Sequence, residues 1–187
     1  MCTTSAHAFC FEEAAQRYGV SADLLRAIAR VESSMNPAAI NGSHQEATGS
    51  VDLGLMQINS RHLESGLRNT GITRKDLLSD ACLNTKVGAW ILADHLRRHG
   101  QDWNGVGSYN AACTQLKGEA CTAARNKYAW KVYRALVGQK AVRAAEPSPQ
   151  VQQRVAMSRP RPIASADIPT DNPSPAAATT NESAFTQ

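Results

Sequence analysis

Residues 22–37 read ADLLRAIARVESSMNP, and this stretch carries the strongest structural signal in the chain. Ser21 stands before it as a natural helix N-cap, and Asn36-Pro37 ends the helical spacing. At about 100° per residue, Glu32 falls inside an apolar stripe made by three side chains: Leu25, Ile28 and Met35. The spacing therefore predicts an amphipathic helix that turns one carboxylate toward the core.

A carboxylate on a buried helix face favours acid–base chemistry. Burial without a cation disfavours the charged form of Glu32 and raises its pKa. A carboxyl group that stays protonated near neutral pH can serve as a general acid. The helix alone leaves open an alternative, a structural glutamate that pairs with an arginine or caps a neighbouring helix.

The rest of the sequence up to residue 138 predicts more helices and almost no strand. Residues 38–59 are rich in Gly, Ser and Asn, which is typical of a long irregular loop or a short hairpin. Alternating apolar and polar residues, the mark of half-buried strands, are absent. Helical segments are expected at residues 11–18, 61–67, 73–78, 84–99, 103–110 and 122–137. The sequence thus predicts one mostly α domain over residues 9–138.

The composition changes after Gly138. Residues 139–187 contain no glycine, seven of the eight prolines and Phe185 as their single aromatic residue. Such a segment buries too little apolar area to offset its ordering entropy, so we expect a disordered tail. A solvated spacer is the favoured interpretation, because the segment contains no repeat or motif. A partner-binding or cleavable arm is the alternative.

The N-terminus and the charge balance bear on localisation. Residues 1–8 end in Ala6-His7-Ala8, an A-x-A pattern of the kind that signal peptidase cuts, although the basic and apolar parts of a signal peptide are missing. We expect residues 1–8 to be a signal-peptide remnant, with a chance match as the alternative. The sequence contains no run of 18 apolar residues, so it predicts no membrane-spanning helix. The formal net charge of +4, without a long basic block, does not argue for nucleic-acid binding.

Four of the five cysteines lie in the predicted domain, and none forms a C-x-x-C motif, so we expect no zinc site, other metal or cofactor. Cys113 and Cys121 bracket a short polar loop, as a local disulfide would. Cys10 would then pair with Cys82. Such bonds persist only in an oxidising compartment, which points outside the cytosol. Reduced, buried cysteines in a cytosolic protein are the alternative.

Two histidines near a helix end, His95 and His99, have the i, i+4 spacing of zinc ligands. Position 96 is leucine, so the H-E-x-x-H motif fails. We expect a solvated pair that the helix dipole favours.

Four sequence blocks resemble the soluble lytic transglycosylase catalytic domain family. In order, they are Glu32-Ser33-Ser34-Met35-Asn36-Pro37, Gly54-Leu55-Met56-Gln57-Ile58-Asn59, Ser108-Tyr109-Asn110-Ala111 and Tyr128-Ala129-Trp130-Lys131-Val132-Tyr133. The cysteine pattern is most similar to the small transglycosylases of conjugation, secretion and pilus machines. The resemblance implies a lysozyme-like fold of the goose-type kind. One departure is Ser108, where the family usually has alanine.

The resemblance also implies a reaction. The family cleaves the β-1,4 bond between N-acetylmuramic acid and N-acetylglucosamine in peptidoglycan. Glu32 would be the only catalytic carboxylate, first as the acid on the leaving oxygen and then as the base on the muramic acid 6-hydroxyl. The product would carry a 1,6-anhydro ring, and no water would be consumed.

The matching blocks imply several substrate-binding residues. Ser33 would orient sugar or carboxylate, and Met56 and Gln57 would line the cleft against the N-acetyl groups. Tyr109 would form a hydrogen bond near the Glu32 carboxyl. The remaining two are Asn110, at the adjacent sugar subsite, and Tyr128, whose hydroxyl could equally belong to the core.

Two alternatives stay open. A hydrolytic muramidase needs a second carboxylate, about 5–5.5 Å from the first if it retains configuration or about 6.5–9.5 Å if it inverts, and the candidates are Glu46 and Asp52. The other is a non-catalytic wall-binding assembly protein. In each case we expect a monomer that contacts glycan strands, with components of an envelope machine as candidate partners of the tail.

Overall fold

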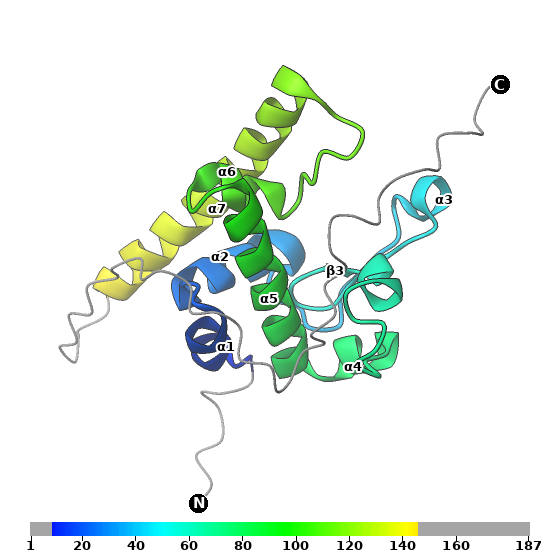
Figure 1. Cartoon of the computed structure of the whole chain (residues 1–187). Coiled ribbons are helices and arrows are strands. Elements are labelled where there is room, and N and C mark those ends of the chain that lie inside the picture. The colour runs from blue at the N-terminus through cyan, green and yellow to red at the C-terminus, as the bar shows by residue number, and fades with distance from the viewer. Residues whose placement is uncertain (1–8, 146–187) are drawn as a thin grey trace, which may run out of the picture.

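The computed structural model describes residues 9–145, which form a mostly helical domain (Figure 1). The N-terminal helices are α1 (Phe11–Tyr18) and α2 (Ala22–Ser33). The later helices are α4 (Arg74–Ser79), α5 (Ala81–His99), α6 (Trp103–Ser108) and α7 (Gly118–Ala145). The mostly α fold predicted from the sequence is confirmed. The predicted signal remnant, residues 1–8, and residues 146–187 lie outside the described residues.

Helix α2 begins and ends near the predicted bounds. The Ser21 hydroxyl accepts a hydrogen bond from Leu24 N at 3.3 Å, which satisfies one of the free N–H groups of the first turn. Leu25 and Ile28 are fully buried, so the predicted apolar stripe faces the core. The helix ends at Ser33, and Ser34 caps it in the left-handed region at φ 54°.

The segment after α2 forms the predicted hairpin-like region. Strands β1 (Ile40–Asn41), β2 (Asp52–Leu53) and β3 (Ile58–Asn59) make a small antiparallel sheet in the order β1-β2-β3. Asn41 pairs with Asp52, and Asp52 pairs with Asn59. The short helix α3 (Gln45–Thr48) lies between the first two strands, and the 3-10 helix η1 (Ser60–Glu64) follows the third. The helical segment predicted at residues 61–67 is a 3-10 helix, and it ends at Glu64.

Helix α5 crosses the centre of the molecule, with α1 and α4 packed against it (Figure 1). It begins at Ala81, three residues before the predicted start, because the Asp80 carboxylate caps it by accepting a hydrogen bond from Leu83 N at 2.9 Å. A disulfide between Cys10 and Cys82 fastens the first turn of α5 to the start of α1.

Helix α7 is longer than the sequence predicted at both ends. It packs against α2 and α6 and continues through Ala145, beyond the expected boundary at Gly138. Gln139, placed in the tail by composition, is buried. Helix α7 therefore extends seven residues past the predicted boundary, Gly138. Helix α6 is shorter than expected and ends at Ser108. None of the described helices is long and apolar enough to cross a lipid bilayer.

Candidate active site

Glu32 lies in the last turn of α2, where the helix stops abruptly. The two residues that follow Ser33, Ser34 and Met35, both have positive φ, at 54° and 68°. Residues other than glycine adopt this region at an energetic cost, and such outliers gather at functional sites. Gln57, in the loop facing this turn, also has a positive φ, 48°. The site is thus bounded by two segments of unusual backbone.

The half-buried carboxyl of Glu32 has an elevated pKa. This pKa rises from 4.5 to about 7, chiefly through desolvation and further through the negative charge of Asp52. The hydrogen bond from Tyr128 and the positive charge of Lys131 act in the opposite direction. At neutral pH Glu32 therefore exists in both protonation states, as a group that gives and then takes a proton requires.

Tyr128, on α7, is the direct partner of this carboxyl. Its hydroxyl donates a hydrogen bond to Glu32 Oε1 at 2.5 Å. Burial and the Glu32 charge raise the Tyr128 pKa well above 10, so the phenol keeps the proton that it donates. This bond joins α2 and α7 through two residues that are 96 positions apart in sequence.

Tyr109 forms its hydrogen bond with the backbone of the neighbouring loop. Its hydroxyl donates to the carbonyl of Met56 at 3.0 Å, and Tyr128 makes the direct bond to Glu32. Burial, with the Glu32 charge next, raises the Tyr109 pKa well above 10, so this ring lies within the field of the acid. Asn110 is exposed beside it and remains accessible to a ligand.

Ser33 makes an internal contact between two segments of the site. Its hydroxyl lies 2.7 Å from the carbonyl oxygen of Leu55 and 3.1 Å from that of Ala29. Donation to Leu55 ties the end of α2 to the loop that carries residues 54–57. The contact of Ser33 with sugar or carboxylate stays a prediction.

Met56 and Gln57 both make internal contacts, and their role in lining the cleft stays a prediction. Met56 is fully buried, and its side chain packs where a Cβ on Gly88 would stand, 2.8 Å away. The Gln57 amide donates to the carbonyls of Gly54 at 2.8 Å and of Ala39 at 3.2 Å. Both residues therefore shape the loop.

Asn84, on α5, is the residue that sequence analysis missed. It is fully buried, and its Oδ1 accepts a hydrogen bond from Met56 N at 2.8 Å. Its Nδ2 donates to the carbonyls of Leu53 and Leu77, both at 2.9 Å. A Cβ at Gly54, where φ is +74°, would stand 2.2 Å from this nitrogen, so only glycine fits. The available signal was an amide side chain on a side of the helix that also carries apolar residues.

The two candidate second carboxylates differ in position. Glu46 is exposed on α3. Asp52 accepts a hydrogen bond from Asn59 Nδ2 at 2.8 Å, and His44 Nε2 lies 3.6 Å from its other oxygen. Of these two carboxylates, only Asp52 acts electrostatically on the pKa of Glu32.

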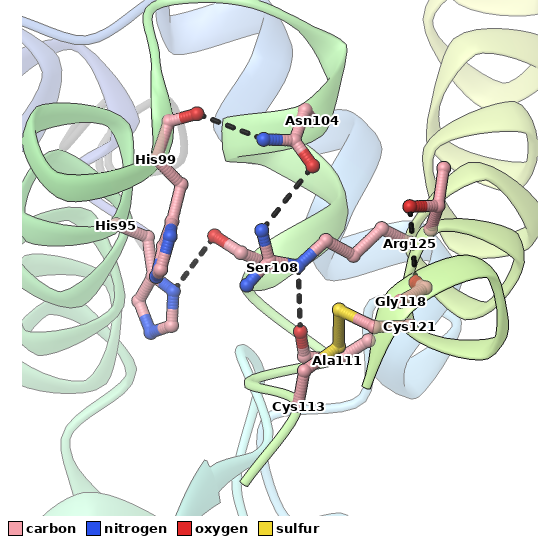
Figure 2. The surroundings of a disulfide bond; sticks show 10 residues. His95, His99, Asn104, Ser108, Ala111, Cys113, Gly118, Cys121 and Arg125 are labelled. Atoms are coloured by element: carbon pink, nitrogen blue, oxygen red, sulfur yellow. Dashed lines mark hydrogen bonds between the residues drawn. A yellow bond between two sulfur atoms is a disulfide. The ribbon is translucent and has the colours of Figure 1, made fainter. Parts of the chain in front are cut away.

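His95 is buried, and the expectation of a solvated histidine pair is wrong for it. Figure 2 shows its Nδ1 facing the Ser108 hydroxyl, 2.9 Å away. Ser108 donates to the carbonyl of Gly105 at 2.7 Å, so the His95 nitrogen is the donor between the two side chains. Burial, and then the charge of Arg98, lowers the His95 pKa to about 4, and the ring is neutral at pH 7. This contact explains the serine at a position where alanine is usual.

The block around Tyr109 is fixed by its neighbours. The predicted disulfide between Cys113 and Cys121 closes the loop after it (Figure 2). Arg125, buried on α7, donates to the carbonyl of Ala111 at 3.1 Å and to Asn104 Oδ1 at 3.2 Å.

Among the described residues, Cys10, Glu13 and Cys82 are close enough together to resemble a metal site. Both sulfurs belong to the disulfide, and the Glu13 carboxylate pairs with Lys86 at 2.7 Å. These side chains do not offer the thiolate ligands that a soft metal would need.

Comparison with known proteins agrees with this arrangement. Invasion protein IagB of Salmonella typhimurium is 41% identical over 140 residues, which cover 73% of this chain and 82% of IagB. Protein IpgF of Shigella flexneri is 37% identical over 125 residues, which cover 67% of this chain and 77% of IpgF. A peptidoglycan-binding-like protein of Escherichia coli O157:H7 is 37% identical over 128 residues, which cover 66% of this chain and 74% of that protein. The family description "Transglycosylase SLT domain" matches residues 9–131, and the chain belongs to that family.

Proposed function

We propose that the protein is a peptidoglycan lytic transglycosylase that cleaves the β-1,4 bond between N-acetylmuramic acid and N-acetylglucosamine. The observation that carries the proposal is the half-buried Glu32 carboxyl, whose pKa is about 7 and which Tyr128 holds by a hydrogen bond. A protein that only bound glycan would have no use for an acid poised in this way. The match to the family and the four sequence blocks support the substrate class.

In the proposed reaction Glu32 gives and then recovers one proton. Tyr128 donates to Oε1, so the carboxyl proton resides on Oε2 and faces the glycosidic oxygen. Its transfer breaks the bond from C1 of the muramic acid and releases the 4-hydroxyl of N-acetylglucosamine. The carboxylate then takes the proton of the muramic acid 6-hydroxyl as that oxygen bonds to C1. Glu32 ends protonated, and a 1,6-anhydro ring forms without water.

Hydrolysis is less well supported. It would use Asp52 as a base or nucleophile, as in glycosidases with two carboxylates. Asn59 and His44 already contact both oxygens of Asp52, which leaves it poorly placed to activate a water. Its negative charge instead favours the protonated form of Glu32.

We further propose that the enzyme works in the periplasm and opens the wall locally for a secretion, conjugation or pilus machine. Two disulfides among the described residues suit an oxidising compartment. The names of two relatives, an invasion protein and a peptidoglycan-binding-like protein, fit a role at the cell wall.

The decisive experiment is mass spectrometry of the products from purified glycan strands. We expect 1,6-anhydro ends from the unaltered protein and a loss of about 10²–10⁴-fold in turnover for Glu32→Gln, because a placed acid typically contributes that much. Glu46→Gln is the matched control, since it removes an exposed carboxylate on α3 and should retain activity. Reducing ends from the unaltered protein would establish hydrolysis. Full activity in Glu32→Gln would show that another group is the acid.

A further inference from the structure

A second surface feature lies between α6 and α7. It is a pocket of about 230 Å³, called here the aromatic pocket, and it is lined by Trp103, Asn126, Ala129, Trp130 and Tyr133. The Trp130 side chain is 59% exposed, and Trp103 and Tyr133 are also more than two-fifths exposed. Large aromatic side chains gathered at an open surface indicate a binding site.

The aromatic pocket is separate from the candidate active site. Tyr128, which reaches Glu32, and Trp130 are two residues apart on α7. At about 100° per residue, their side chains leave the helix roughly 160° apart. Helix α7 thus presents one face to Glu32 and the opposite face to the aromatic pocket.

The ring geometry and the nearby charges define what would fit. Trp103 and Trp130 each meet the Tyr133 ring nearly edge-on, with centroids 5.5 and 5.4 Å away. Proline-rich segments bind between aromatic rings of this kind, because a polyproline II helix is already extended. Two exposed cations, Lys127 and Arg134, lie within about 60° of Trp130 on α7. An acidic proline-rich segment is therefore the complementary ligand.

The chain itself contains such a segment. We propose that the aromatic pocket binds residues 167–175 of the same chain, which read DIPTDNPSP. This stretch holds three prolines and two aspartates, with no lysine or arginine. Its prolines can pack against the aromatic rings of the pocket, and its aspartates are complementary in charge to Lys127 and Arg134.

Reach and charge separate this segment from the other proline clusters. Trp130 lies 15 residues before the end of α7 at Ala145, a distance of about 22 Å along the helix. Pro149 follows Ala145 by four residues, so it reaches at most about 14 Å back. Residues 159–162, RPRP, reach far enough but carry two arginines that Lys127 and Arg134 would repel. Asp167 follows Ala145 by 22 residues, which can span about 70 Å.

The test uses the full chain, with the indole N–H resonances of its three tryptophans followed by NMR. Pro169→Ala with Pro173→Ala should shift the resonances of Trp103 and Trp130 and leave that of Trp90, which packs against Gly66, unmoved. Pro160→Ala with Pro162→Ala is the matched control and should shift none of them. A synthetic peptide of residues 165–177 should restore the original positions in the first variant at about millimolar concentration, the range expected for a tethered segment.

Two results would overturn the proposal. Unchanged Trp103 and Trp130 resonances in the Pro169→Ala, Pro173→Ala variant would mean that this segment does not occupy the aromatic pocket. Resonances that move with protein concentration in the unaltered chain would assign the aromatic pocket to a second copy. N-acetylglucosamine oligomers test whether the aromatic pocket binds glycan instead. Their addition should leave the Trp103 and Trp130 resonances in place.

Discussion

Glu32 is the residue on which the proposed chemistry depends, and its neighbours act on its pKa with opposite signs. Burial and Asp52 favour the protonated form, whereas Tyr128 and Lys131 favour the carboxylate. The first chemical step requires the protonated form, so activity should fall as pH rises through about 7. Each neighbour therefore sets the position of the alkaline limb of the pH profile.

Two variants should move that limb in opposite directions. Tyr128→Phe removes a hydrogen bond that stabilises the carboxylate, so the Glu32 pKa rises and the limb moves to higher pH. Asp52→Asn removes a negative charge, so the Glu32 pKa falls and the limb moves to lower pH. The measurement is kcat against pH on glycan strands. Movement in the same direction for both variants would contradict this account of the site.

The same carboxyl should make stability depend on pH. The folded-state pKa of Glu32 is about 7, above its ordinary value of 4.5, so its contribution to folding is present below pH 4.5 and is lost as pH rises to 7. Glu32→Gln cannot ionise and avoids this loss. The difference in free energy of unfolding, variant minus unaltered protein, should therefore increase between pH 4.5 and pH 7. Above pH 7 it should level off, at a gain on the order of 3 kcal/mol for the variant. Urea unfolding at pH 4 and pH 8 checks this, and an equal difference at both would refute it.

Asn84 is a residue whose importance is structural. Asn84→Ala would leave the Met56 amide and the carbonyls of Leu53 and Leu77 without their partner. Each buried group left unpaired costs about 1–3 kcal/mol, so we expect a loss of at least about 3 kcal/mol in urea unfolding. Asn126→Ala removes an exposed amide on α7 and is the control, with an expected change within about 0.5 kcal/mol. Similar losses for the two variants would show that Asn84 does not support the loop.

Among the elements, the two disulfides constrain very different lengths of chain. Cys10 and Cys82 are separated by 72 residues, and Cys113 and Cys121 by 8. In the chain-entropy model, the long loop contributes about 4 kcal/mol and the short one about 2.5 kcal/mol. Replacing Cys10 and Cys82 by serine should therefore lower the free energy of unfolding more than replacing Cys113 and Cys121. The reverse order in urea unfolding would contradict this assignment.

Helical periodicity was sufficient to predict α2, its buried face and Glu32, because the pattern of a single helix is local. The bounds of α5 and α7 were less accurate. The Asp80 cap of α5 was overlooked, and the composition changes only gradually near Gln139. The Asp80 cap is a local contact, whereas the burial of Gln139 on α7 depends on packing that a composition boundary does not record.

The roles of individual site residues were harder to predict than the acid itself. Ser33 bonds to a carbonyl 22 residues away, and Tyr109 to one 53 residues away. Such partners depend on how the loops close. The positive φ angles of Ser34, Met35 and Gln57 turn the chain in directions that sequence spacing does not reveal.

At the scale of the whole molecule, α7 connects the parts of the protein. One face supplies Tyr128 to Glu32, and the opposite face carries the aromatic pocket. The helix continues to Ala145, and the proline-rich residues follow directly. Occupation of the aromatic pocket would therefore leave the candidate active site open.

This arrangement predicts where the chain can be shortened. A protein that ends at Ala145 retains every described helix, so it should unfold cooperatively, within about 0.5 kcal/mol of the full chain. It should also retain turnover on isolated glycan strands, because the aromatic pocket faces away from Glu32. A protein that ends at Gly138 loses the buried Gln139 and the last turns of α7, and its thermal midpoint should be lower. Circular dichroism melting of the three proteins measures this. Equal midpoints for the two shortened chains would place the domain boundary back at Gly138, and loss of the transition at Ala145 would show that later residues are part of the fold.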